Sequence, residues 1–156
     1  MATTEAARLV VRGAELEVAL GEVDAVLAAV PEGDYRERLV ALRGELTGDG
    51  PGDEGVAELD RLIEIALQTG RLRAVYGPGG EAAATRLYRR LPSGRELSAS
   101  AAEINEAFRA LSGQVLEDVA LSVNGPGGFT LALTVGGREL TVRLDRQGVR
   151  LHALGV

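Results

Sequence analysis

The chain of 156 residues contains no cysteine. This absence excludes disulfide bonds, thiolate metal ligands and cysteine nucleophiles, and it is typical of proteins from a reducing compartment. Lysine is absent as well, so all 17 basic side chains are arginine. Together with the abundance of alanine, glycine and valine, this bias is typical of a GC-rich, bacterial-type genome. Selection for the fork geometry with which arginine pairs with carboxylates and phosphates is a secondary explanation.

Long uncharged apolar runs are also missing. The longest nearly apolar stretch, residues 23–30, already contains Asp24 and is far too short to cross a membrane. Residues 1–15 carry four charged side chains, so they resemble neither a signal peptide nor a transit peptide. We therefore expect a cytoplasmic protein that does not associate with membranes.

Charge is unevenly distributed within an otherwise ordinary globular composition of 46% apolar and 26% charged residues. Residues 1–70 hold fifteen acidic and six basic side chains, a net charge of −9, whereas residues 71–100 hold six arginines and two glutamates, a net charge of +4. This complementarity predicts contacts between the two segments, within one chain or between chains.

Three helices are predicted in residues 1–70. The first runs from a Thr3 or Thr4 cap to about Val30, the second begins at a capping box of Asp34 and Glu37, and the third follows the glycine-rich loop 47–53 and ends at Gly70. An apolar stripe along the first helix is predicted to form a partner-binding or dimer surface. Its members are Leu9, Leu16, Leu20, Val23 and Leu27.

The middle of the chain is ambiguous. Residues 71–76 are predicted to form a short strand and residues 77–80, Gly-Pro-Gly-Gly, a turn. Residues 81–91 fit a helix or a strand, and a strand over residues 84–91 is slightly favoured because a Val-x-Gly-Pro-Gly-Gly sequence occurs at both 75–80 and 123–128. We interpret this echo as shared hairpin chemistry and leave open whether it is a true repeat.

A further helix is predicted from a capping box of Ser100 and Glu103 to Gly113, followed by a four-stranded antiparallel meander. In the meander, apolar residues alternate with small or polar ones. Three predicted turns place all the apolar side chains on one face: a five-residue loop at 124–128, a two-residue type I′ turn at Gly136-Gly137 and a four-residue turn at 145–148. The predicted cross-strand pairs are Val123 with Phe129, Leu121 with Leu131, Leu131 with Val142, Leu133 with Leu140, Leu144 with Val149 and Val142 with Leu151.

These elements predict an α+β fold in two parts. Residues 1–70 form an acidic helical segment, and residues 71–156 form an α+β domain whose sheet packs on helices through its apolar face. The last strand, residues 149–154, is a second candidate contact if it forms an open sheet edge.

Three features could carry chemistry, and each has a simpler interpretation. His152 is the only histidine and has no nearby acid or nucleophile, so we interpret it as a surface residue. Residues 77–82 match a dinucleotide-binding Gly pattern, but an antiparallel meander is not the parallel sheet that this motif requires. Asp49, Asp53 and Glu54 lack calcium-loop spacing. The sequence therefore predicts no cofactor, no metal and no enzymatic activity.

Two functions remain. The first is a non-enzymatic protein-interaction or adaptor module, expected to be a homo-oligomer. The alternative is binding of an anionic ligand or nucleic acid through the arginine cluster 71–95, although the acidic balance and the absence of lysine weigh against nucleic acid. The candidate anion or partner contacts are Arg71, Arg73, Arg86, Arg89, Arg90, Arg143 and Arg150.

Overall fold

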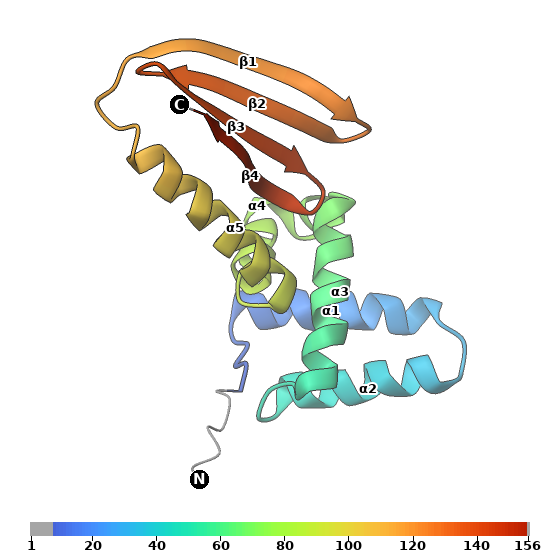
Figure 1. Ribbon diagram of the computed structural model, residues 1–156. Coiled ribbons are helices and arrows are strands. Elements are labelled where there is room, and N and C mark those ends of the chain that lie inside the picture. The colour runs from blue at the N-terminus through green and yellow to red at the C-terminus, as the bar shows by residue number, and fades with distance from the viewer. Residues whose placement is uncertain (1–7, 156) are drawn as a thin grey trace. The chain divides into compact units, whose positions relative to one another are not determined.

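A computed structural model describes residues 8–155, with the side chains of 153–155 left undescribed. These residues form an α+β fold, as the sequence predicts, with five helices followed by one antiparallel sheet (Figure 1). The elements are α1 (Ala14–Ala29), α2 (Asp34–Thr47), α3 (Asp53–Gln68), α4 (Arg71–Tyr88), α5 (Pro92–Arg109), β1 (Leu116–Gly125), β2 (Gly128–Val135), β3 (Arg138–Asp145) and β4 (Gly148–Gly155).

The chain divides into two compact units, which we call the helical unit (Met1–Arg95) and the sheet unit (Glu96–Val156). This boundary differs from the predicted one at residue 70. The reason is α4, which packs against α1 and α3 and so extends the helical unit beyond the three predicted helices.

The core of the helical unit consists of aliphatic side chains from α1, α2, α3 and α4. Leu39, Leu59, Ile63, Leu72 and Leu87 are among those that are fully buried. Within the first seventy residues the buried positions recur at spacings of three or four, as Leu39, Leu42 and Leu46 do along α2, which is why the helical pattern there could be predicted from the sequence.

Helix α1 begins later than predicted. It starts at Ala14 after Gly13, whose φ of 57° lies in the left-handed region that interrupts a helix. Thr3 and Thr4, the predicted caps, lie outside the described residues. Leu9 is described but precedes the helix, so it is not part of a continuous α1 stripe.

Both predicted capping boxes are wrong. Helix α2 follows Gly33 and has no side-chain cap, so Asp34 is its first helical residue. Helix α5 starts at Pro92, a favoured first position because proline lacks the N–H that a first turn leaves unpaired. Ser100 therefore lies inside α5, where its hydroxyl donates a hydrogen bond to the Val149 carbonyl of β4.

Residues 71–76 and 84–88 are helical, so the predicted strands there are wrong. Both belong to α4, which is kinked at Gly77 with a φ of 69°. Pro78 follows the kink, where a proline begins a new helical segment without losing a needed N–H. Burial of Leu72 and Leu87 in the helical core favours this arrangement over a strand.

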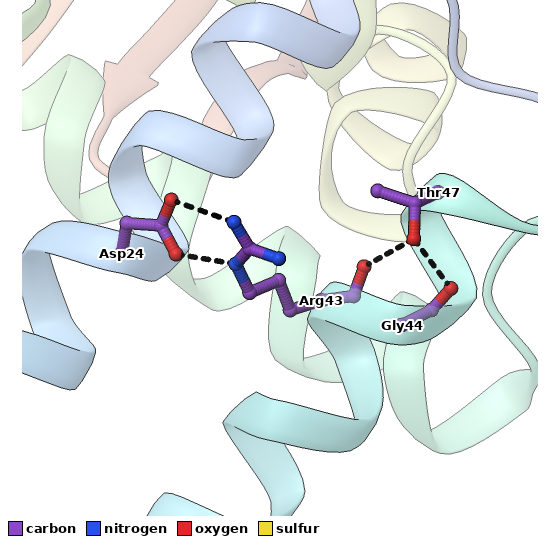
Figure 2. A network of polar contacts seen from close by, with 4 residues as sticks. All are labelled: Asp24, Arg43, Gly44 and Thr47. Carbon is purple, nitrogen blue, oxygen red and sulfur yellow. Dashed lines mark hydrogen bonds and ion pairs between the residues drawn. The ribbon is translucent and has the colours of Figure 1, made fainter.

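An ion pair joins α1 to α2 on the surface of the helical unit (Figure 2). The Arg43 Nε atom lies 2.7 Å from Asp24 Oδ1. At the end of the same helix, the Thr47 hydroxyl donates to the carbonyl of Gly44 at 3.0 Å, so it occupies one of the carbonyls that a helix C-terminus leaves free.

The sheet has the predicted meander topology, with strand order β1-β2-β3-β4 and antiparallel neighbours (Figure 1). All of the predicted cross-strand pairs are confirmed. Gly136 and Gly137 have φ values of 56° and 73°, as the predicted type I′ turn requires. The β1–β2 turn is tighter than predicted, because Gly125 pairs with Gly128.

Helix α5 covers only part of the apolar sheet face. Ile104 and Leu111 of α5 form a buried cluster with Val135 of β2 and with Leu140 and Val142 of β3. The prediction that the sheet packs on helices through one face therefore holds for its β3 side. The β1 side differs, and it is described next.

Candidate interaction surface

The apolar stripe predicted as a partner surface lies mostly within the helical unit. Val23 is fully buried. The other four residues are partly buried against the same core, and they are Leu9, Leu16, Leu20 and Leu27. Because these side chains already pack on neighbouring helices, they offer little free apolar surface for a partner.

The predicted arginines do not form a single site. Arg86 and Arg90 contact Glu15 of α1, with N···O distances of 3.8 and 2.6 Å, and Arg71 contacts Glu22 at 3.2 Å. Arg73 lies 3.6 Å from Glu81. Two of these four pairs join basic α4 to acidic α1, and Arg90, which follows α4, makes a further contact with α1, so the charge asymmetry of the sequence is used inside the helical unit.

A buried polar cluster lies at the kink of α4. Glu22 is 5% exposed, and its carboxylate accepts a hydrogen bond from Arg71 at 3.3 Å. Burial raises the pKa of the neighbouring Tyr76 above its usual value of about 10, and Glu22 raises it further by charge and hydrogen bonding. This cluster of a carboxylate, a guanidinium and a phenol links α4 to α1.

A second buried carboxylate holds the first turn of α5. Asp60 of α3 accepts hydrogen bonds from the Ser93 amide at 3.0 Å and from the Ser93 hydroxyl at 2.8 Å, both through Oδ2. These contacts satisfy a free N–H at a helix N-terminus, where negative charge is favourable.

None of the motifs that could carry chemistry gains support from the geometry. The Gly-Pro-Gly-Gly segment at 77–80 lies within a kinked helix, so it does not follow the strand that a dinucleotide fingerprint requires. Among residues 8–155, no group of three or more acidic or histidine side chains is arranged to hold a metal ion. No helix in that range has the length and apolar character to cross a membrane.

The β1 side of the apolar sheet face is uncovered. Val119, Leu121 and Val123 of β1 are 50%, 64% and 71% exposed, and Phe129 opposite Val123 is 41% exposed. By contrast, Leu140 and Val142 on β3 are at most 1% exposed. We call the four residues Val119, Leu121, Val123 and Phe129 the β1 surface. Contiguous apolar exposure of this kind marks interaction sites in folded proteins.

The β1 strand is also a sheet edge, with register shifts against β2 near its two ends, between Leu116 and Asp118 and between Val123 and Gly125 (Figure 1). Proteins usually guard edge strands with charged side chains, prolines or bulges, because the free N–H and C=O groups can pair with another strand. From Val119 to Gly125, β1 carries no charge and no proline. The other edge, β4, carries Arg150 and His152 and has a register shift against β3.

The two ends of β1 differ in charge. Glu117 and Asp118 lie near its start. At its far end, the tip of the β1–β2 hairpin lies beside the β3–β4 turn in a shallow hollow of about 370 Å³, whose lining includes Gly127, Arg143 and Arg146. Arg143 lies 3.8 Å from Asp145, whereas the Arg146 side chain lies against Gly127. The edge is thus acidic at one end and basic at the other.

Comparison with protein-family models, curated proteins and solved structures gave no match for this chain.

The β1 surface was missed in the sequence because alternation shows which face of a strand is apolar but not how much of that face a helix covers. A signal was nevertheless present. Residues 119–137 contain no charged side chain, although they include most of two strands. A stretch this long without charge at the edge of a meander could have indicated a contact surface.

Proposed function

We propose that the protein is a non-enzymatic interaction module that binds an extended apolar polypeptide segment along β1. The observation that carries this proposal is the contrast across one sheet face, where Leu121 is 64% exposed and Leu140 is fully buried.

Strand addition suits this surface. An added strand would pair with the free backbone groups of the β1 edge and would place alternate side chains beside Val119, Leu121 and Val123. Residues 119–125 of β1 are uncharged, so this part of the edge lacks the repulsion and desolvation that charged edge residues impose on such a partner.

Site-specific photo-crosslinking in the native host cell tests the proposal. Leu121 is replaced by p-benzoylphenylalanine, and the control carries the same group in place of Leu151, which is 44% exposed on the opposite edge strand. We expect a discrete protein adduct from position 121 and none from position 151. No adduct, or equal adducts from both positions, would contradict binding along β1.

A further inference from the structure

Among residues 8–155 the helical unit contains no strand, so within a second copy of this chain only the sheet unit offers strand edges that could pair with β1. In the sheet unit, β2 and β3 are already paired on both sides. Pairing of β1 with the β4 of another copy would leave a free edge at each end and would continue as an open fibre. Pairing of β1 with β1 closes after two copies.

We propose that two copies of this chain form a dimer by antiparallel pairing of β1 with β1 about a two-fold axis. This inference rests on the proposed function, because it names the occupant of the same surface. A two-fold pairing is self-complementary, so every contact occurs twice.

The register follows from the apolar alternation. The apolar residues of β1 have odd numbers, and they stay on one face of the joined sheet only if odd positions pair with odd positions. An axis at Leu121 pairs Leu121 with its own copy and Val119 with Val123. An axis at residue 120 would instead place the charged Glu117 opposite the apolar Val123. An axis at residue 122 would place Asp118 opposite Pro126, which lies beyond the end of the strand and has no N–H for pairing.

Charge supports the same arrangement. With the axis at Leu121, Asp118 lies opposite Asn124 of the other copy, next to the hairpin tip where Arg146 lies against Gly127. Each acidic strand start thus meets the basic end of the other copy, twice per dimer. A parallel arrangement would bring the acidic ends together, and like charges across an interface oppose association.

The expected affinity is modest. One strand pair buries less than the roughly 800 Å² per partner of a standard interface. We therefore expect a dissociation constant on the order of 10 μM, and the dimer should form within a concentration series from about 1 to 500 μM.

Sedimentation equilibrium of the full chain and of two charge-reversal variants tests the dimer. Asp118→Arg and Arg146→Glu each place like charges at both contacts of their own homodimer, so each variant alone should dimerise about tenfold more weakly than the unaltered chain. In an equimolar mixture, both contacts of the mixed dimer are again complementary. The mixture should therefore recover the affinity of the unaltered chain.

Three outcomes overturn the inference. The first is that the unaltered chain stays monomeric up to about 500 μM. The second is that either single variant dimerises with the same affinity as the unaltered chain. The third is that the mixture of the two variants dimerises no more tightly than either variant alone. If the chain is monomeric while position 121 still cross-links to a different protein, self-pairing is wrong and the proposed function stands. Circular dichroism of each variant checks that its secondary structure matches that of the unaltered chain.

Discussion

At the scale of single residues, the kink of α4 shows how glycine permits close packing. Tyr76 lies against Gly21 of α1 and against Gly80 of its own helix, and a Cβ atom at either glycine would overlap the tyrosine side chain. Neither glycine has a positive φ. Glycine is therefore required there for space and not for backbone conformation.

Two neighbouring glycines of α4 provide a matched test. Gly80→Ala should lower the free energy of unfolding of the helical unit by about 1–3 kcal/mol, because the new methyl group overlaps Tyr76. Gly79→Ala should raise it by up to about 1 kcal/mol, because a Cβ there meets nothing within 4 Å and alanine favours a helix. All three tyrosines lie in the helical unit and tryptophan is absent, so tyrosine fluorescence in urea measures both effects. Equal effects of the two substitutions would contradict the proposed packing.

The raised pKa of Tyr76 predicts a loss of stability in alkali. Burial and Glu22 disfavour the ionised phenol in the folded state, so the unfolded state releases this proton at lower pH. The contribution of the Tyr76 phenol to the free energy of unfolding is complete well below its unfolded pKa of about 10, and it is lost as the pH rises through the folded pKa. Tyr76→Phe should therefore show a shallower decline in unfolding free energy between pH 9 and about 11.5, measured by circular dichroism in urea. Tyr35, whose pKa is also raised by burial, retains its share of the decline. Identical pH profiles for the two proteins would contradict this assignment.

At the scale of elements, the meander could be predicted in detail because two independent constraints agree. Period-two alternation fixes the faces, and the lengths of the glycine-rich turns fix the register. Val142, for example, pairs with Leu131 and Leu151 as predicted. A slip of one residue would have exposed every buried side chain of β3.

The region 71–91 could not be predicted, because local sequence does not decide its structure. The same Gly-Pro-Gly-Gly tetrapeptide forms a helix kink at 77–80 and a hairpin tip at 125–128. What differs is the packing of the flanking residues. Leu72 and Leu87 are buried in the helical core, whereas Val123 and Phe129 pair across two strands. Tertiary contacts of this kind override local propensity.

The difference between the two sides of the sheet predicts opposite effects on stability. Leu121→Lys should change the unfolding free energy of the sheet unit by no more than about 0.5 kcal/mol, because the side chain is 64% exposed. Leu140→Ala should cost about 2–5 kcal/mol, because it leaves a cavity beneath α5. Urea unfolding at low protein concentration, followed by circular dichroism, measures both values. A large loss for Leu121→Lys would show that β1 is covered within the monomer.

At the scale of the whole molecule, charge serves two purposes. In the helical unit, Arg71 and Arg86 of α4 pair with Glu22 and Glu15 of α1, so the charge asymmetry between residues 1–70 and 71–100 is used within one chain. In the sheet unit, the β1 edge is acidic at its start, with Glu117 and Asp118, and basic at its far end, near Arg146. This second asymmetry is what gives the proposed dimer its direction.

The absence of cysteine makes the central claim directly testable, because one introduced cysteine can react only with itself in another copy. Directly opposite Cβ atoms on antiparallel strands lie about 4.5–5.5 Å apart, close enough for a disulfide after small adjustments. Single variants Val119→Cys, Leu121→Cys, Val123→Cys and Leu151→Cys are oxidised at about 50 μM, and disulfide-linked dimers are measured on a non-reducing gel.

We predict rapid dimer formation by Leu121→Cys alone, slow formation by the other three, and rapid formation when Val119→Cys and Val123→Cys are mixed. No cross-linking at position 121, or equal cross-linking at positions 121 and 151, would contradict the pairing of β1 with its own copy.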